Sequence, residues 1–287
     1  MITTSLQVRS AVFKDQQQIA NLMYFESHVH RHLDWRAPLD WLGSPNFWVL
    51  EDNQHIVGTL ACPKDSHQVA WVRLFAHADR IPMFEAWKTL WDVAEFEIAK
   101  NNGGTVAAIA IQKWMQRILE TSDFINSQEI VMFQWHNGPM MRLPLPKGIS
   151  LRLMTPEDLP GVAELDSASF NPLWQNPLEA LMKAFPQAHI ATVMEDDQGL
   201  VGYQITTENP LGAHLARLAI RPDAQKRGLG STLVADLLKR LDKMMIRRLS
   251  VNTQNDNIGS MALYSKMGFV KTGEQYPVYR YDIQPLK

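Results

Sequence analysis

Apolar residues recur every three or four positions between residues 231 and 245. The positions concerned are Leu233, Val234, Leu237, Leu238, Leu241, Met244 and Met245. This spacing places them on one face of an amphipathic helix. Residues 149–154 alternate between apolar and polar side chains instead, which predicts a half-buried strand. Thr155 and Pro156 then supply an N-cap and a first helical position, so we expect a helix from there to about Ser169.

The same patterns predict the rest of the second half. We expect a helix at 177–184, a hairpin of strands at 189–195 and 200–207, a strand at 213–220, a strand at 248–253, a helix at 259–267 and two strands between 268 and 282. The first half predicts a similar order. Its strands are expected at 6–9, 47–50, 55–62, 68–76, 106–111 and 128–135, and its helices at 14–24, 81–100 and 112–121. The repeated order of elements indicates a duplicated unit.

A boundary between the two halves is expected at residues 137–148. This stretch carries three prolines and two glycines, a composition that suits neither a helix nor an internal strand. We therefore predict one domain at 1–136, a stiff linker at 137–148 and a second domain at 149–287.

Composition limits the classes of function. The chain has 287 residues, 46% of them apolar and 20% charged, with a net charge of −2, which fits a globular protein with no concentrated basic surface for nucleic acid. The single cysteine, Cys62, excludes an intramolecular disulfide. The sequence has neither a signal-peptide pattern at its start nor an apolar run of membrane-spanning length, so we expect a cytoplasmic protein without a membrane partner. The oligomeric state is not predicted.

The turn between the strand at 213–220 and the helix at 231–245 carries the most specific chemistry. Its sequence is Arg-Pro-Asp-Ala-Gln-Lys-Arg-Gly-Leu-Gly, residues 221–230. Gly228 and Gly230 permit a sharp turn and a close approach to the backbone. The amides of the first helical turn have no partner within the helix, and Lys226 and Arg227 add positive charge, so an anion site is expected here. A plain strand–turn–helix connection without a ligand is the alternative.

Residues 225–230 resemble the Gln/Arg-x-x-Gly-x-Gly/Ala signature of the GNAT superfamily, whose members are acyl-CoA-dependent N-acyltransferases. The resemblance implies two α/β (α+β) domains, each a mixed, mostly antiparallel sheet with flanking helices. It implies that the turn binds the CoA pyrophosphate and that the preceding strand binds the pantetheine arm. The residues implied for acetyl-CoA are Leu218, Ala219, Ile220, Gln225, Lys226, Arg227, Gly228, Leu229, Gly230, Ser231, Asn257 and Tyr264.

A second segment carries the resemblance further. Asn257 stands seven residues before Tyr264, and Gly268 and Phe269 follow it, as in the superfamily pattern of an asparagine followed by Ala-Leu-Tyr-x-x-x-Gly-Phe. The resemblance implies that Tyr264 is the general acid that protonates the departing thiolate. Asn257 can also cap the following helix, and Tyr264 can also pack in the core.

The general base is left open by the sequence. An amine that attacks a thioester must lose a proton. Superfamily members often use a glutamate on or beside the central strands, yet the strand at 213–220 contains no acid. The candidates are Glu164, Asp166, Glu208, His214 and a chain of water molecules.

The first half lacks the corresponding signature. Its turn, residues 76–85, has no Gly-x-Gly and contains Asp79, which would repel a pyrophosphate. We therefore expect a degenerate GNAT-like domain that does not bind CoA. His28, His30, His32 and Asp34 resemble a metal site by composition, but no further pair completes the set, and no metal is expected.

The resemblance favours an enzyme that transfers an acetyl group from acetyl-CoA to a primary amine. Tandem chains of this superfamily, including the mycothiol synthase type, often keep one active half, which favours a small-molecule acceptor. A protein N-terminus or a lysine is the alternative acceptor. A non-catalytic acyl-CoA-binding or regulatory module is the alternative function.

Overall fold

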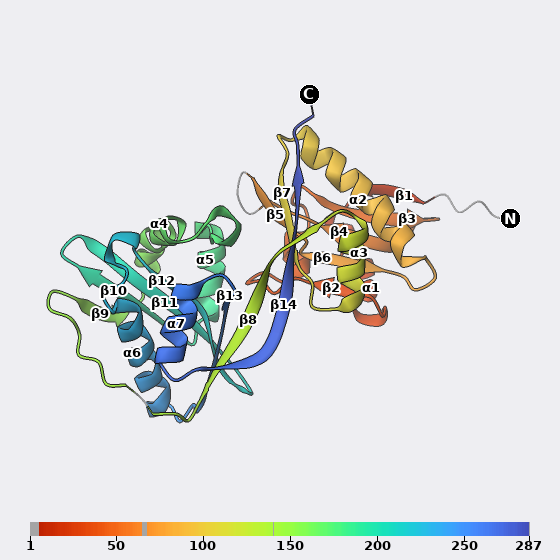
Figure 1. Cartoon of the computed structure of the whole chain (residues 1–287). Coiled ribbons are helices and arrows are strands. Elements are labelled where there is room, and N and C mark those ends of the chain that lie inside the picture. The colour runs from red at the N-terminus through yellow and green to blue at the C-terminus, as the bar shows by residue number, and fades with distance from the viewer. Residues whose placement is uncertain (1–5, 65–67, 140, 287) are drawn as a thin grey trace. The chain divides into compact units, whose positions relative to one another are not determined.

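A computed structural model describes residues 6–64, 68–139 and 141–286 of the chain (Figure 1). The described residues form two compact units. Unit 1 lies within residues 1–127 and 276–287, and unit 2 lies within residues 128–275. No helix in the described part of the chain is both long enough and apolar enough to cross a membrane.

The sheet of unit 2 has six strands that follow the predicted segments closely. Their order is β8 (Ile125–His136), β13 (Arg248–Gln254), β12 (Gly212–Ile220), β11 (Gly199–Asn209), β10 (Ile190–Asp196) and β9 (Ser150–Leu153). β12 and β13 run parallel, whereas the other neighbours in this order are antiparallel. The parallel pair therefore lies in the interior of the sheet.

Helices cover both faces of this sheet. Figure 1 shows α4 (Leu159–Ser169) and α5 (Leu178–Ala184) on one face, and α6 (Leu229–Lys243) and α7 (Ile258–Lys266) on the other. The apolar stripe of α6 is buried from Leu229 to Leu241, as its spacing predicts. Met244 and Met245 lie beyond the end of the helix and are exposed, because Met245 adopts a positive φ of 64° that ends the helical backbone.

Unit 1 has a five-stranded sheet and a shorter ribbon. The sheet order is β1 (Gln7–Ser10), β3 (Phe47–Asp52), β4 (His55–Ala61), β6 (Leu74–His77) and β2 (Val29–Arg31). The ribbon contains β5 (Val69–Trp71), β7 (Gly104–Ile109) and the end of β14 (Val270–Ile283). The helices are α1 (Gln16–Phe25), α2 (Met83–Lys100) and α3 (Lys113–Thr121).

The prediction of one continuous strand at 68–76 is wrong, because the two halves of this segment pair with different strands. The amide of Val72 donates to the carbonyl of Ala107 in β7, whereas the amide of Arg73 donates to the carbonyl of Ala61 in β4. The segment therefore divides into β5 and β6. The sequence also did not predict β2, which has only three residues, too few for an alternating pattern to stand out.

Two strands pass from one unit to the other. β8 follows α3 of unit 1, but its residues from Gln128 onward pair with β13 of unit 2. β14 follows α7 of unit 2, but Val278–Ile283 pair with β7 of unit 1. The two strands predicted between residues 268 and 282 are therefore one strand, and the compact units differ from the predicted division at residues 137–148. Local pattern indicates that a segment is extended, but not which sheet receives it.

An ion-pair cluster recurs in both halves and supports the duplication. In unit 2, Arg152 binds Asp158, six residues later, and Glu195 on β10, each at 2.7 Å. In unit 1, Arg9 binds Asp15, also six residues later, and Glu51 on β3, each at 2.6 Å. The same chemistry at the same spacing, on strands of the same order, indicates a common origin for the two halves.

Candidate functional site

The parallel pair at the centre of unit 2 separates after three residues. Ala213, His214 and Leu215 of β12 pair with Leu249, Ser250 and Val251 of β13, and the ladder ends there. Beyond this point β12 continues to Ile220 with β11 as its only strand neighbour among the described residues. One edge of the second half of β12 is therefore left open.

The register of β12 determines which backbone groups lie on the open edge. The amide of Arg221 donates to the carbonyl of Val201 in β11, and Ala219 pairs with Tyr203. Because alternate residues of a strand direct their backbone groups to opposite edges, those of Leu218 and Ile220 point away from β11. The carbonyl of Ile220 already accepts from the side chains of Gln225 and Ser169, at 3.0 and 3.2 Å. The open edge thus offers the backbone groups of Leu218 and the amide of Ile220 to an extended amide-containing chain.

The open edge leads directly to the predicted anion site. A short turn at Pro222–Ala224 follows β12, and α6 begins at Leu229. Gly228 precedes the helix with a φ of +82°, and a side chain placed there would meet no atom within 4 Å. The first amides of α6 lack partners within the helix, and Lys226 and Arg227 are exposed beside them. The geometry suits a negatively charged group in front of Gly228.

Several predicted site residues in this segment have structural roles as well. The side chain of Leu229 is buried in the core. A side chain at Gly230 would approach Leu263 of α7 to 3.2 Å, so this glycine allows α6 and α7 to pack closely. Gln225 donates its side-chain amide to the carbonyl of Ile220 at 3.0 Å. Ser231 is buried in the first turn of α6.

Asn257 caps α7, one of the two roles that its position suggested. Its side-chain oxygen accepts a hydrogen bond from the amide of Ser260 at 3.1 Å. This bond satisfies one of the free donors at the start of the helix and fixes the direction of α7. The helix then carries Tyr264 in its second turn.

Tyr264 lies in the core on the α6 and α7 face of the sheet. Its ring packs against Phe133 and Phe269, at centroid distances of 6.0 and 5.7 Å. Among the described residues its hydroxyl has no hydrogen-bond partner, and it is not sealed from solvent. Burial raises the pKa of Tyr264, while the charge of Arg217 opposes that rise. The hydroxyl is thus protonated at neutral pH and free to donate.

Asp166 belongs to a buried network, which argues against a role as a base. Arg217 of β12 donates to both of its oxygens, at 2.7 and 2.8 Å. The hydroxyl of Tyr203 and the amide of Asn176, at 2.7 Å, donate to it as well. Arg217 also donates to the carbonyl of Trp174 at 2.6 Å. This network holds the loop after α4 against β12 and occupies the lone pairs of Asp166.

The other candidate bases differ in their surroundings. Glu164 is exposed on α4. Glu208 pairs with His189 at 2.8 Å, and its side chain is 40% exposed. His214 lies in the parallel ladder, with its Nδ1 atom 2.9 Å from the hydroxyl oxygen of Ser250. Burial lowers the pKa of His214. Of these three residues, only His214 lies where β12 and β13 separate.

In unit 1 the corresponding edge is covered by the chain itself. β6 pairs with β4 as β12 pairs with β11, and β5 pairs in parallel with β7. β2 lies along the free edge of β6, with His30 opposite Phe75. In the turn after β6, the amide of Asp79 donates to the carboxylate of Glu26 at 2.9 Å. A strand and a carboxylate of the chain thus occupy positions that are open in unit 2.

The four residues that resemble a metal site by composition make separate contacts. The ring of His32 packs against that of Trp71, at a centroid distance of 4.8 Å. His30 donates its Nε2 proton to the carbonyl of Val72 at 3.1 Å, and Asp34 pairs with Arg73 at 3.1 Å. His28 stacks on His77 and lies 3.5 Å from Asp79. Within residues 6–64, 68–139 and 141–286, no group of three or more His, Cys, Asp and Glu side chains is arranged to hold a metal ion.

The burial of His30 predicts acid sensitivity of unit 1. Burial lowers the pKa of His30 to about 4 from an ordinary 6.5. Between these values the unfolded chain binds a proton that the folded chain does not, so the free energy of unfolding falls as pH falls from 6.5 to 4, by about 3 kcal/mol. Denaturant unfolding over this range should show a smaller fall in His30→Gln. The exposed His55→Gln is the control, and equal pH dependence in all three proteins would contradict the prediction.

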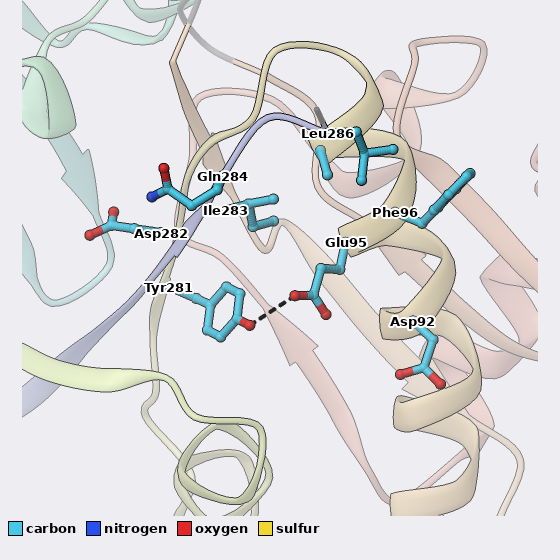
Figure 2. A pocket seen from close by; sticks show the side chains of 9 residues that line it. Asp92, Glu95, Phe96, Tyr281, Asp282, Ile283, Gln284 and Leu286 are labelled. Atoms are coloured by element: carbon cyan, nitrogen blue, oxygen red, sulfur yellow. Dashed lines mark hydrogen bonds between the residues drawn. The ribbon is translucent and has the colours of Figure 1, made fainter.

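Unit 1 also contains a cavity of about 530 Å³ between α2 and the end of β14 (Figure 2). Its carboxylates already have partners. Glu95 accepts from the hydroxyl of Tyr281 at 2.8 Å, and Asp92 pairs with Lys88 at 2.7 Å. Figure 2 shows Asp282 pointing away from both of these acids. The cavity therefore presents no free charged group.

Comparison with known proteins agrees with this geometry. Residues 159–269 match the profile of the Acetyltransferase (GNAT) family. This segment of the chain belongs to the GNAT superfamily. Members of the family are N-acetyltransferases that use acetyl-CoA as co-substrate. The matched segment begins at α4, includes the open edge and the turn at Gly228, and ends after α7.

Characterised relatives of this GNAT chain act on different acceptors. The [ribosomal protein bS18]-alanine N-acetyltransferase of Escherichia coli (strain K12) is 25% identical over 103 residues, which cover 32% of this chain and 70% of that protein. The mycothiol acetyltransferase of Paenarthrobacter aurescens (strain TC1) is 30% identical over 145 residues, 44% of each chain. Sequence similarity therefore identifies the superfamily without selecting an acceptor.

The fold extends the similarity to the whole GNAT chain. A tandem GNAT protein from the clavulanic acid biosynthesis pathway matches with a TM-score of 0.64 and 14% identity, over 99% of this chain and all of that one. The predicted fold class of two GNAT-like domains with mixed, mostly antiparallel sheets is confirmed. The family profile matches the second half of the chain.

The sequence does not predict the roles of Arg217 and Ser250 in unit 2, nor the strand β2 in unit 1. Arg217 and Ser250 stand in alternating strand patterns, where a polar residue ordinarily indicates a solvent-facing position. The sequence carries a second signal of the duplication beside the repeated order of elements. Arg9 with Asp15, and Arg152 with Asp158, follow the start of each half at equal spacing and would have aligned the two.

Proposed function

We propose that the chain transfers an acetyl group from acetyl-CoA to a primary amine of a small molecule, in unit 2. The open edge of β12 at Leu218 and Ile220, continuous with the anion-binding turn at Gly228, carries the proposal. The pantetheine arm pairs along this edge, and the pyrophosphate meets the first amides of α6. The thioester then lies where β12 and β13 separate.

The proposal of a small-molecule acceptor rests on fewer observations than the proposal of an acetyl-CoA site. One relative is named for the acetylation of mycothiol, whereas the other is named for the acetylation of an alanine of ribosomal protein bS18. The loop after α4 borders β12 through Arg217 and carries Phe170 and Trp174, with the guanidinium of Arg217 3.6 Å from the Phe170 ring centre. Two aromatic side chains beside β12 suit a small acceptor better than a polypeptide.

Calorimetry tests the central claim. Acetyl-CoA and CoA should each bind with a stoichiometry of one per chain, because β2 and Glu26 occupy the corresponding positions in unit 1. A panel of amino sugars, polyamines, amino acids and peptides, with release of free thiol as the signal, then identifies the acceptor. Undetectable binding of both cofactors would refute the proposal. Two equivalent sites would refute the assignment of unit 1 as inactive.

Tyr264→Phe distinguishes an enzyme from a non-catalytic acyl-CoA-binding module. Removal of the hydroxyl should lower kcat about a hundredfold, since general acid catalysis contributes about that much. The affinity for acetyl-CoA should stay within about twofold, because the ring still packs against Phe133 and Phe269. Tyr276→Phe, a change of the same kind at a position outside the site, is the control. An unchanged kcat in Tyr264→Phe would remove Tyr264 from the mechanism.

A further inference from the structure

A histidine and a serine meet at the last rungs of the parallel ladder between β12 and β13. His214 and Ser250 are paired residues of the two strands, and the ladder ends one residue later. The hydroxyl of Ser250 donates to the carbonyl of Ala213 at 3.3 Å. With its single proton used there, the Ser250 oxygen accepts from Nδ1 of His214 at 2.9 Å. This arrangement places the imidazole proton on Nδ1.

The other ring nitrogen is then an unprotonated acceptor. In the described part of the chain, Nε2 of His214 has no hydrogen-bond partner, and unlike Nε2 of His77 it is not sealed from solvent. Burial keeps the ring neutral by lowering its pKa. A neutral imidazole with an accessible lone pair, held in one tautomer by a neighbour, is the form that accepts a proton.

The placement of His214 complements that of Tyr264. Leu215 belongs to the same core as Tyr264, on the face covered by α6 and α7. Because neighbouring residues of a strand point to opposite faces, His214 lies on the face of α4 and α5. Groups on opposite faces of a sheet can reach one reacting carbon only where the strands part. His214 stands next to that point, and the ring of Tyr264 packs against Phe133, which pairs with Val251 at the end of the ladder.

The charged groups near His214 on the neighbouring strands are paired with other residues or exposed to solvent. Arg217 on the same strand is bound to Asp166 of α4. Glu208 on β11 is bound to His189, and Arg248 stands at the exposed start of β13. Burial, rather than a neighbouring charge, therefore controls the protonation of the ring.

We propose that His214, held by Ser250, is the general base of the acyl transfer. The inference rests on the proposed function. The acceptor nitrogen forms a bond to the thioester carbon, and its proton passes to Nε2 of His214. The carbon–sulfur bond breaks, and the departing sulfur takes the hydroxyl proton of Tyr264. His214 and Tyr264 then return to their starting states by exchanging one proton through solvent.

Histidine NMR tests the tautomer without any acceptor. Two-bond ¹H–¹⁵N spectra of the full chain, with the signal assigned by its loss in His214→Gln, should show a neutral ring protonated on Nδ1 at pH 7. The ring should gain its second proton only below pH 6.5, in keeping with its lowered pKa. A ring protonated on Nε2 at pH 7 would overturn the proposal, even if acetyl-CoA binds and is consumed.

Kinetics test the role with the amine that releases most thiol in the panel. His214→Gln should lower kcat about a hundredfold while calorimetry gives an unchanged acetyl-CoA affinity. His189→Gln, the same substitution at another partly buried histidine of unit 2, should leave kcat unchanged. In the unsubstituted chain kcat should fall as pH drops below 6.5, and this limb should be absent from His214→Gln. An unchanged kcat in His214→Gln would overturn the proposal, whereas absence of acetyl-CoA binding by the unsubstituted chain would refute the proposed function itself.

Discussion

A chain shortened to residues 149–287 is expected not to fold. It retains the whole predicted second domain but loses β8, whose Val131, Phe133 and Trp135 are buried in the core of unit 2. Burial of one such side chain contributes about 2–3 kcal/mol, so three contribute on the order of 6–9 kcal/mol against a typical domain stability of about 5–15 kcal/mol. The shortened chain also leaves the edge of β13 unpaired.

A fragment of residues 128–275 is the matched control. It is of similar length, keeps β8, and omits the end of β14 that pairs with β7. Circular dichroism during denaturant titration should give a cooperative transition for this fragment and none for 149–287. If 149–287 unfolds as cooperatively as 128–275, unit 2 does not need β8 to fold, and its stability comes from other contacts.

Gly228→Leu is expected to abolish binding of acetyl-CoA. Apart from its chain neighbours, nothing in the described chain lies within 4 Å of a Cβ atom at this position, so we expect the new side chain to project into the space in front of the α6 amides. It would exclude the pyrophosphate and lower the affinity more than a thousandfold, or about 4 kcal/mol. Calorimetry against the unsubstituted chain measures the loss.

The backbone strain of this substitution needs its own control. Gly273 has a φ of +88°, close to the +82° of Gly228, and a side chain there would also meet nothing within 4 Å. Gly273→Leu therefore carries a similar conformational cost, about 1–2 kcal/mol for a left-handed residue, without a ligand in front of it. Both variants should lose similar stability. If Gly228→Leu retains the affinity of Gly273→Leu, the pyrophosphate binds elsewhere.

The spacing of apolar and polar residues was sufficient to predict most helices and strands of the fold. The spacing of Leu233, Leu237 and Leu241 predicted α6, and the alternation at 149–154 predicted β9, because burial of one face imposes a period that the sequence must follow. The sequence also predicted the turn at Gly228, since glycine is the residue that most readily adopts a left-handed backbone before a helix. These features depend on residues close together in the chain.

Local sequence pattern did not predict that β8 pairs in unit 2 and that the end of β14 pairs in unit 1, because these pairings depend on long-range contacts. Val278–Ile283 are suited to a strand in either unit, and their pairing with β7 is fixed by the side chains that they meet there. The hydroxyls of Tyr279 and Tyr281 donate to Glu120 and Glu95 of unit 1, at 2.6 and 2.8 Å. No local sequence pattern predicts contacts between residues so far apart in the chain.

The sequence by itself determined the superfamily, the repeated order of elements and the position of the anion-binding turn, because each depends on residue types at short, fixed spacing. Only the tertiary structure decided which candidate base stands at the open end of the ladder, since Glu164, Asp166, Glu208 and His214 differ in their partners rather than in their neighbours along the chain. It also decided that β2 covers the edge of unit 1 that is open in unit 2. Hydrogen-bond partners and burial are properties of the folded chain, and they separate residues that the sequence leaves equivalent.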